Sequence, residues 1–230
     1  MPIIADEVSF LAHTMPLLAG YLARPSGTGP FPALVVIHEA FGLNDDIRSI
    51  ARRFAGAGYV ALAVDLFSGR KQVACMFRMM GGLLLNSLDH GGVRDLKDAL
   101  TYLEQQPAVD PARIGAVGYC LGGSLAIAWA CTDDRLKAIA PYYAMNPRPL
   151  EAVARACPLV GSYPDPDFTA KAGRALDAEL GKHAIAHDVK LYPGARHSFF
   201  NGGPNYDAAA ASDSWARVLA FFSEHIASKQ

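Results

Sequence analysis

The stretch GAVGYCLGGS, residues 115–124, decides the fold because it joins a short apolar run to a helical segment through a cysteine flanked by glycines. Gly118, Cys120 and Gly122 fit the pattern glycine, any residue, nucleophile, any residue, glycine, with cysteine where serine is more common. A nucleophile in this pattern lies on a sharp turn, where a Cβ atom two residues away on either side would collide with backbone. The stretch therefore predicts a strand, a strained turn at Cys120 and a helix.

The position of Cys120 at the start of a helix also indicates its chemistry. Unpaired backbone N–H groups and the positive end of the helix dipole face the thiol, and both favour the reactive thiolate. The backbone N–H of Leu121 is placed to donate to an oxyanion, a contact worth about 3–4 kcal/mol of barrier. The alternatives are a glycine-rich turn with a core cysteine and a phosphate-binding loop, although the glycines lack the order G-x-G-x-x-G of a dinucleotide site.

Outward from this turn, short apolar runs alternate with amphipathic segments, which is typical of strands joined by helical crossovers. The runs expected to form strands are 33–37, 60–64, 114–117, 138–140, 159–160 and 188–192, after an antiparallel strand in 13–24. Apolar residues at helical spacing occupy 47–55, 93–103, 176–180 and 215–226, the first after Asn44 as the N-cap. We predict a single α/β domain over residues 1–230, with a mostly parallel central sheet and helices on both faces.

The passage 76–92, rich in glycine and methionine, is the least regular part of the chain. In a sheet protein such a passage often covers a ligand site, and we expect the same here.

Composition narrows the classes of function. The net charge is −1 and charges of both signs are mixed, which argues against nucleic acid or a membrane and for a small-molecule partner. The first seven residues do not read as a signal peptide, so we expect a cytoplasmic protein, monomeric or weakly dimeric. The four cysteines show neither CxxC pairing nor histidine clusters, so no metal and no cofactor are expected.

A nucleophile needs a base and an acid that orients the base, and in hydrolases with such a turn the order is nucleophile, acid, histidine. His197 follows the strand that ends at Tyr192, so its imidazole can reach the carboxyl edge of the sheet. His38, at the end of the run 33–37, is the competing base, or else a hydrogen-bonded core histidine. For the acid, Asp165 and Asp167 both leave a strand, and we favour Asp167 because it opens the following helix; a helix cap or turn residue is the alternative.

Five segments together resemble the dienelactone hydrolases (carboxymethylenebutenolidases), a cysteine-using branch of the α/β-hydrolase superfamily. These segments are His38–Gly42, Asp65–Phe67, Gly118–Gly122, Gly161–Asp167 and Tyr192–Phe199. The resemblance covers most of the chain. It implies the α/β-hydrolase fold, with Cys120 as nucleophile, Asp167 as orienting acid and His197 as base.

The resemblance also implies roles that the residues alone do not. Glu39, otherwise read as an exposed turn carboxylate, would interact with the thiol at rest and help to generate the thiolate when substrate arrives. The backbone N–H of Ala40 would be the second oxyanion donor. Relatives that open dienelactone hold its carboxylate with arginines, one of them four residues after the histidine, and this chain has Asn201 there. A neutral amide cannot form the bidentate, charge-assisted hydrogen bonds of a guanidinium, so one interaction with the carboxylate of the lactone is missing.

We expect four side chains to contact substrate: Arg78, Asn201, Phe41 and Phe199. Arg78 could supply the other arginine or be a surface helix charge, and Arg196 and Arg70 are expected near the mouth of the site.

The sequence thus predicts a cysteine-dependent hydrolase that opens a lactone or activated ester through a thioester, with a Cys-His-Asp triad. A thioesterase or acyltransferase with the same site is one alternative. The other is a non-catalytic relative that binds a small ligand or senses oxidation through Cys120.

Overall fold

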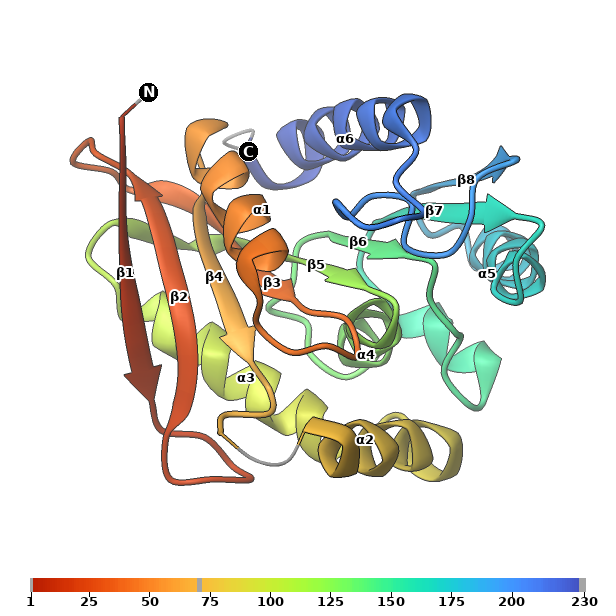
Figure 1. Cartoon of the computed structure of the whole chain (residues 1–230), viewed down its shortest axis with the longest axis horizontal. Coiled ribbons are helices and arrows are strands. Elements are labelled where there is room, and N and C mark those ends of the chain that lie inside the picture. The colour runs from red at the N-terminus through yellow and green to blue at the C-terminus, as the bar shows by residue number, and fades with distance from the viewer. Residues whose placement is uncertain (1, 70–71, 228–230) are drawn as a thin grey trace.

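The computed structural model describes residues 2–69 and 72–227, and one eight-stranded sheet runs through them (Figure 1). The strand order is β1-β2-β4-β3-β5-β6-β7-β8, with β1 and β2 antiparallel to their neighbours and β3 to β8 parallel to one another. The strands are β1 (Ile3–Phe10), β2 (Leu18–Pro25), β3 (Phe31–Ile37), β4 (Val60–Asp65), β5 (Val109–Tyr119), β6 (Ile139–Tyr142), β7 (Leu159–Asp165) and β8 (His187–Pro193). The mostly parallel sheet is confirmed.

The antiparallel part differs from the prediction. The antiparallel strand expected in 13–24 is present as β2, but it begins only at Leu18, and β1 precedes it as an additional strand. Pro16 lies in the turn between them, and proline cannot donate a ladder hydrogen bond. The edge strand β1 is mostly exposed, so its sequence lacks the apolar run of a buried strand.

Helices pack on both sides of the sheet, as predicted. They are α1 (Asp45–Gly56), α2 (Gln72–Asn86), α3 (Gly91–Glu104), α4 (Leu121–Ala130), α5 (Ala170–Lys182) and α6 (Ala208–Phe222), with short helices at Leu150–Arg155 and Ser223–Ala227. Helices α1 and α6 cover one face and α3, α4 and α5 the other (Figure 1). Alternate residues of β3 enter the two cores, Val36 toward α1 and Val35 toward α3.

The predicted cap of α1 is present. The Asn44 side-chain oxygen accepts a hydrogen bond from the Ile47 N–H at 3.1 Å, which satisfies one of the unpaired donors of the first turn. Ile47, Ile50 and Phe54 then lie on one face of the helix and are buried against the sheet.

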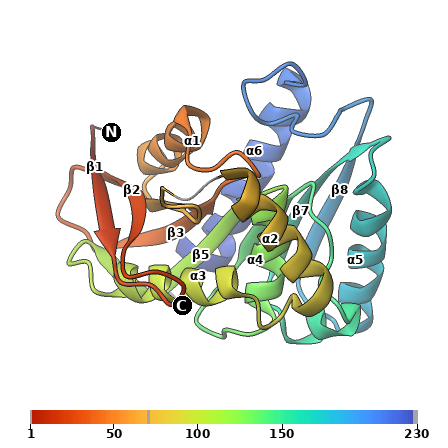
Figure 2. The ribbon, with the colours of Figure 1, turned by 60° about the horizontal axis from the view of Figure 1, so that its bottom comes forward.

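The passage 76–92 is not irregular, which corrects the sequence-based prediction. It forms most of α2 and the start of α3, and α2 packs against α4 (Figure 2). Glycine inside a helix costs about 1 kcal/mol relative to alanine, which is why a helix was not expected. A Cβ atom at Gly82 would lie 2.4 Å from the His90 ring, so this glycine allows α2 to approach the residue that caps α3.

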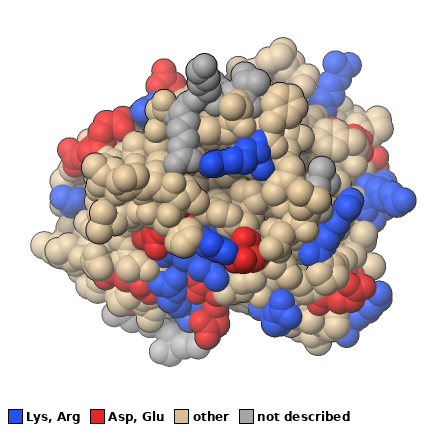
Figure 3. Space-filling model, turned by 90° about the horizontal axis from the view of Figure 1, so that it is seen from below, with Lys and Arg blue, Asp and Glu red and all other residues tan. Residues whose placement is uncertain are grey.

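The surface seen from below carries charges of both signs, interspersed with broad uncharged areas (Figure 3). Among the helices of the described residues, none combines the length and the apolar character needed to cross a bilayer.

Candidate active site

The turn at Cys120 has the predicted geometry. Cys120 lies between β5 and α4 with φ of 52°, in the left-handed region that non-glycine residues rarely adopt. A Cβ atom at Gly118 would lie 2.2 Å from the Gly122 carbonyl oxygen, and one at Gly122 would lie 2.5 Å from the Ile37 carbonyl oxygen. The need for glycine on both sides of Cys120 is therefore confirmed.

Hydrogen bonds hold this turn against the next strand and its own helix. The Cys120 N–H donates to the Tyr142 carbonyl at 3.0 Å, and the Cys120 carbonyl accepts from the Ser124 N–H at 3.0 Å and the Ser124 hydroxyl at 3.1 Å. The Ser124 oxygen in turn accepts from the Met145 N–H at 2.9 Å. The strained backbone is thus fixed by the elements around it.

The expectation of an ionised thiol is wrong for the resting protein. Burial raises the pKa of Cys120 to about 12, and the charges of Glu39 and Asp167 act in the same direction. The Leu121 N–H opposes them by donating to the sulfur, but it does not outweigh burial. Cys120 is therefore a protonated thiol at neutral pH, and a change at the site is needed before it can act as a nucleophile.

Glu39 is buried rather than exposed, and it lies among strained residues. Its Oε1 accepts a hydrogen bond from the Ser198 hydroxyl at 2.9 Å. Tyr143 is also buried, and its burial together with the charge of Glu39 raises the pKa of its hydroxyl well above 10.0. Cys120, Tyr143 and Ser198 have φ values of 52°, 38° and 64°. Three left-handed residues thus surround one carboxylate, and such strain often gathers at functional sites.

Asp167 and His197 form a pair at the same edge of the sheet. The His197 Nδ1 lies 3.2 Å from Asp167 Oδ1, which also accepts from the Thr169 N–H at 2.9 Å and the Thr169 hydroxyl at 2.5 Å. Asp165 instead pairs with Arg174, with 2.6 Å between the Arg174 nitrogen and the carboxylate. Of the two acids left open by the sequence, the structure places Asp167 next to the histidine.

The His197 ring is further held by two aromatic rings. It stacks on Phe168, with centroids 4.8 Å apart, and contacts Tyr143 at 4.9 Å. Both of these residues also line the cavity at Cys120. The hydrogen bonds formed by the described residues include none between the Cys120 sulfur and His197. The pair thus lies beside the thiol without engaging it at rest.

His38, the competing base, is fully buried and both its ring nitrogens are occupied. Its Nδ1 lies 2.5 Å from the Glu39 carbonyl oxygen, and its Nε2 accepts from the Leu66 N–H at 3.1 Å. Burial lowers the pKa of His38, so the ring is neutral. This arrangement matches the hydrogen-bonded core histidine rather than the base.

Cys120 opens into a cavity of about 170 Å³ whose walls are mainly apolar. It is lined by Ala40, Met80, Leu83, Cys120, Leu121, Ser124, Tyr143, Met145, Asn146, Pro147, Arg148 and Phe168. Both predicted oxyanion residues, Leu121 and Ala40, belong to this lining. The passage 76–92, which was expected to cover a ligand site, supplies Met80 and Leu83 to this lining. The remaining walls were not predicted, although the segment after β6 was open to prediction, because loops at the carboxyl ends of parallel strands carry ligand sites.

The four predicted substrate contacts do not line this cavity. Phe199 is fully buried and packs against Tyr142 and Tyr192. Phe41 is exposed, and Asn201 is buried with its side-chain oxygen unpaired among the described residues.

The predicted arginines do not reach the cavity at Cys120 either. Arg78 lines a different cavity, and Arg196 is exposed outside the lining at Cys120. Arg70 lies outside the described residues. Among the residues that line the cavity at Cys120, Arg148 carries the cationic side chain.

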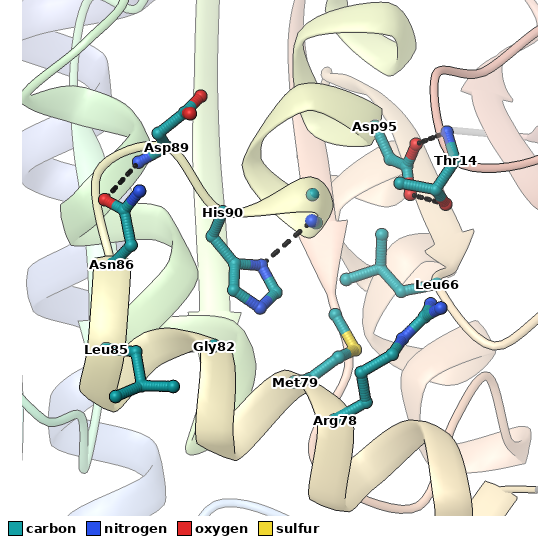
Figure 4. A pocket seen from close by; sticks show the side chains of 12 residues that line it. Thr14, Leu66, Arg78, Met79, Gly82, Leu85, Asn86, Asp89, His90 and Asp95 are labelled. Atoms are coloured by element: carbon teal, nitrogen blue, oxygen red, sulfur yellow. Dashed lines mark hydrogen bonds between the residues drawn. The ribbon is translucent and has the colours of Figure 1, made fainter.

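The other cavity, of about 330 Å³, is lined by residues of α2, of the start of α3 and by Thr14 (Figure 4). Asp95 there accepts from the Thr14 N–H at 2.8 Å and the Thr14 hydroxyl at 2.6 Å, and His90 Nδ1 accepts from the Gly92 N–H at 2.9 Å. These polar groups satisfy one another. Across the described parts of the chain, no three side chains of histidine, cysteine, aspartate or glutamate gather as metal ligands would.

An eight-stranded, mostly parallel sheet with a strained cysteine between its central strand and a helix defines the α/β-hydrolase fold. A solved structure of a dienelactone hydrolase-like promiscuous phosphotriesterase from metagenomic libraries shares this fold. It superimposes with a TM-score of 0.85 at 27% identity, over 97% of this chain and 98% of that one.

The sequence matches the dienelactone hydrolase family over residues 18–226, and the chain belongs to this family. The "Putative carboxymethylenebutenolidase" of Saccharolobus solfataricus is 31% identical, over 89% of this chain and 93% of that protein. The "Probable 2-oxo-3-(5-oxofuran-2-ylidene)propanoate lactonase" of a Bradyrhizobium species is 29% identical, over 91% and 90%. The chain is thus a hydrolase that acts on esters or lactones.

Proposed function

We propose that the protein opens lactones or activated esters by covalent catalysis, with Cys120 as nucleophile, His197 as base and Asp167 as the acid that orients His197. The observation that carries this proposal is the strained Cys120, which shares one cavity with Leu121 and Ala40. A thiol, two amide donors and an apolar enclosure are what acyl transfer through a thioester requires.

In the first half of the reaction, substrate enters the cavity and its carbonyl oxygen accepts hydrogen bonds from the Leu121 and Ala40 N–H groups. Glu39 accepts the thiol proton, and the sulfur attacks the carbonyl carbon. The oxyanion of the tetrahedral intermediate stays on the two amide donors. The bond to the leaving oxygen then breaks, which gives a thioester and an enolate or phenolate.

In the second half, His197 removes a proton from water, and the resulting hydroxide adds to the thioester carbon. Asp167 holds the imidazole in orientation and stabilises its charged form. The carbon–sulfur bond breaks, the sulfur regains the proton held by Glu39, and the proton on His197 passes to the leaving oxygen. A thiolate is expelled easily from a tetrahedral intermediate, so the reaction favours substrates with an even better leaving group, such as an enolate.

The cavity favours a compact substrate with an apolar body. Met80, Leu83 and Phe168 offer hydrocarbon surface, whereas Arg148 adds one positive charge among the lining residues. The lactonase relative from Bradyrhizobium is named for a substrate that carries a propanoate group. We therefore propose aryl and enol esters and unsaturated lactones as substrates, with Arg148 available to an anionic group.

The test is turnover of a panel of unsaturated lactones and aryl acetates by the parent protein and Cys120→Ala. The alanine variant should lose turnover completely while its thermal unfolding changes little. Cys157→Ala, which alters a cysteine outside the cavity, serves as the control and should retain full activity. Mass spectrometry of the parent after brief mixing with an aryl acetate should detect an acetyl group on Cys120. Turnover by Cys120→Ala would exclude the mechanism.

A further inference from the structure

His38 contacts one of the two peptide groups that the proposed reaction needs in a fixed orientation. It is the last residue before the loop that carries Glu39 and Ala40, and it directly follows β3. Its ring is completely buried, and Phe67 packs edge-on against it with centroids 4.8 Å apart. The ring therefore has little freedom to move.

The tautomer of His38 follows from its two partners. The Leu66 N–H can only donate, so the Nε2 that it contacts at 3.1 Å must be the unprotonated nitrogen. The proton of the neutral ring is then on Nδ1, which donates to the Glu39 carbonyl at 2.5 Å. Burial disfavours a second proton on this ring.

The Glu39 carbonyl and the Ala40 N–H belong to the same planar peptide group. The bond between them is trans, so the oxygen and the hydrogen point in opposite directions. Whatever holds the oxygen therefore sets the direction of the N–H. The Glu39 carbonyl is held by His38 and, more loosely, by the Gly42 N–H at 3.4 Å.

The orientation of this peptide group matters because of where the loop lies. Ala40 lines the cavity together with Cys120 and Leu121, whereas His38 lies in the core behind the loop. Because His38 also accepts from Leu66, directly after β4, it ties the peptide group to two neighbouring strand ends. A donor that is fixed before substrate arrives stabilises an oxyanion without a cost of reorientation.

We propose that His38 is a positioning residue of the oxyanion hole: through its hydrogen bond to the Glu39 carbonyl, it aims the Ala40 N–H at the developing oxyanion. This inference rests on the proposed function, because it needs a tetrahedral intermediate at Cys120. It assigns no proton transfer to His38, whose ring stays neutral throughout.

The test compares His38→Leu with His38→Asn. Leucine removes both ring contacts, whereas the amide nitrogen of asparagine occupies the place of Nδ1 and can still donate to the Glu39 carbonyl. We expect His38→Leu to lower kcat for aryl esters about 100-fold with little change in KM, the loss typical of a removed oxyanion donor. His38→Asn should stay within about fivefold of the parent.

A second measurement separates an effect on the orientation of the Ala40 N–H from general damage to the active site. Alkylation of Cys120 by iodoacetamide uses the same sulfur but forms no oxyanion, so its rate should change less than about threefold in both variants. A trifluoromethyl ketone forms a hemithioketal oxyanion with the thiol, and its affinity should fall with kcat in His38→Leu alone.

Three results would overturn the proposal: normal turnover by His38→Leu, equal loss of alkylation and turnover, or equal loss in the asparagine and leucine variants. If His38→Leu does not fold, His38→Gln replaces it, because glutamine places its amide near Nε2, out of reach of the Glu39 carbonyl. Equal activity of His38→Gln and His38→Asn would then refute the inference. Failure of the proposed function is seen separately, as turnover by Cys120→Ala.

Discussion

Replacing Glu39 by glutamine should make the Cys120 thiol more acidic and the enzyme less active. The carboxylate is buried beside the thiol, and its charge opposes formation of a second negative charge on the sulfur. Glutamine keeps the shape of the side chain and can still accept the Ser198 hydrogen bond, so the substitution removes the charge with little change of packing.

The size of the effect follows from the pKa of Cys120, which is about 12 rather than the ordinary 9.0. This difference corresponds to about 4 kcal/mol. Burial is the largest cause and persists in the variant, whereas Glu39 is the second cause and is removed. Less than half of the difference should therefore disappear, and we expect the pKa to fall by about one pH unit.

The assay is the rate of Cys120 alkylation by iodoacetamide between about pH 7 and 10, followed by mass spectrometry. At each pH below the pKa, Glu39→Gln should react about tenfold faster than the parent, because the thiolate fraction is about tenfold larger. Its kcat/KM for aryl esters should nevertheless fall at least tenfold, since glutamine cannot accept the thiol proton. Glu151→Gln, at an exposed position of the short helix Leu150–Arg155, controls for a change of net charge.

The decisive result is that the rate of alkylation rises while the rate of ester turnover falls. Unchanged or slower alkylation would show that the Glu39 charge does not act on the thiol. Faster ester turnover together with faster alkylation would show that Glu39 only suppresses the nucleophile, and the proposed proton acceptor would then be wrong.

Three further results are expected. Asp167→Asn should lower kcat/KM at least 100-fold, whereas Asp165→Asn, which affects the surface pair with Arg174, should cost less than about threefold in the same assay. Arg148→Gln should lower kcat/KM about tenfold for esters that carry a carboxylate and leave neutral esters unchanged. In urea unfolding, Gly118→Ala should lose more than about 3 kcal/mol through backbone collision, whereas Gly56→Ala, with open space around its Cβ, should gain about 0.5 kcal/mol.

Most of the sheet was predictable because the parallel strands β3, β4, β6 and β7 are buried on both faces and read as apolar runs between glycines or prolines. The strand β1 and the helix α2 were not, for different physical reasons. β1 lies at an exposed edge and is held by pairing with β2, which its own residues do not reveal. α2 contains Gly82 because the His90 ring packs there, and such a contact is not visible in local propensity.

The positions of the three proposed reactive residues were predictable, because in this fold they follow particular strands in a fixed order along the chain. The glycines around Cys120 and the loops after β7 and β8 place the thiol, Asp167 and His197 at one edge, although their roles remain a prediction. The ionisation of Cys120 was not predictable from the turn alone. The sequence reveals the helix start, which favours the thiolate, but burial and the proximity of Glu39 exist only in the folded chain and prevail.

The walls of the cavity required the structure for the same reason. Met80 and Leu83 reach it from α2, within the passage that was expected to cover a ligand site, but the sequence did not show which of its residues face the cavity. Arg148 comes from the segment after β6, at a sequence separation that no local pattern links. Phe199 lies two residues from His197, yet it is turned into the core among tyrosines.

The proposed reactive groups and the cavity walls come from different parts of the chain. Cys120, Asp167 and His197 lie at the ends of sheet strands, where a shift of the backbone would disturb the core. Met80 and Met145 are about half exposed, on a helix and a loop outside the sheet. Mutations can therefore accumulate in the walls under selection for new acyl groups while the chemistry is preserved, which makes this scaffold a favourable starting point for directed evolution.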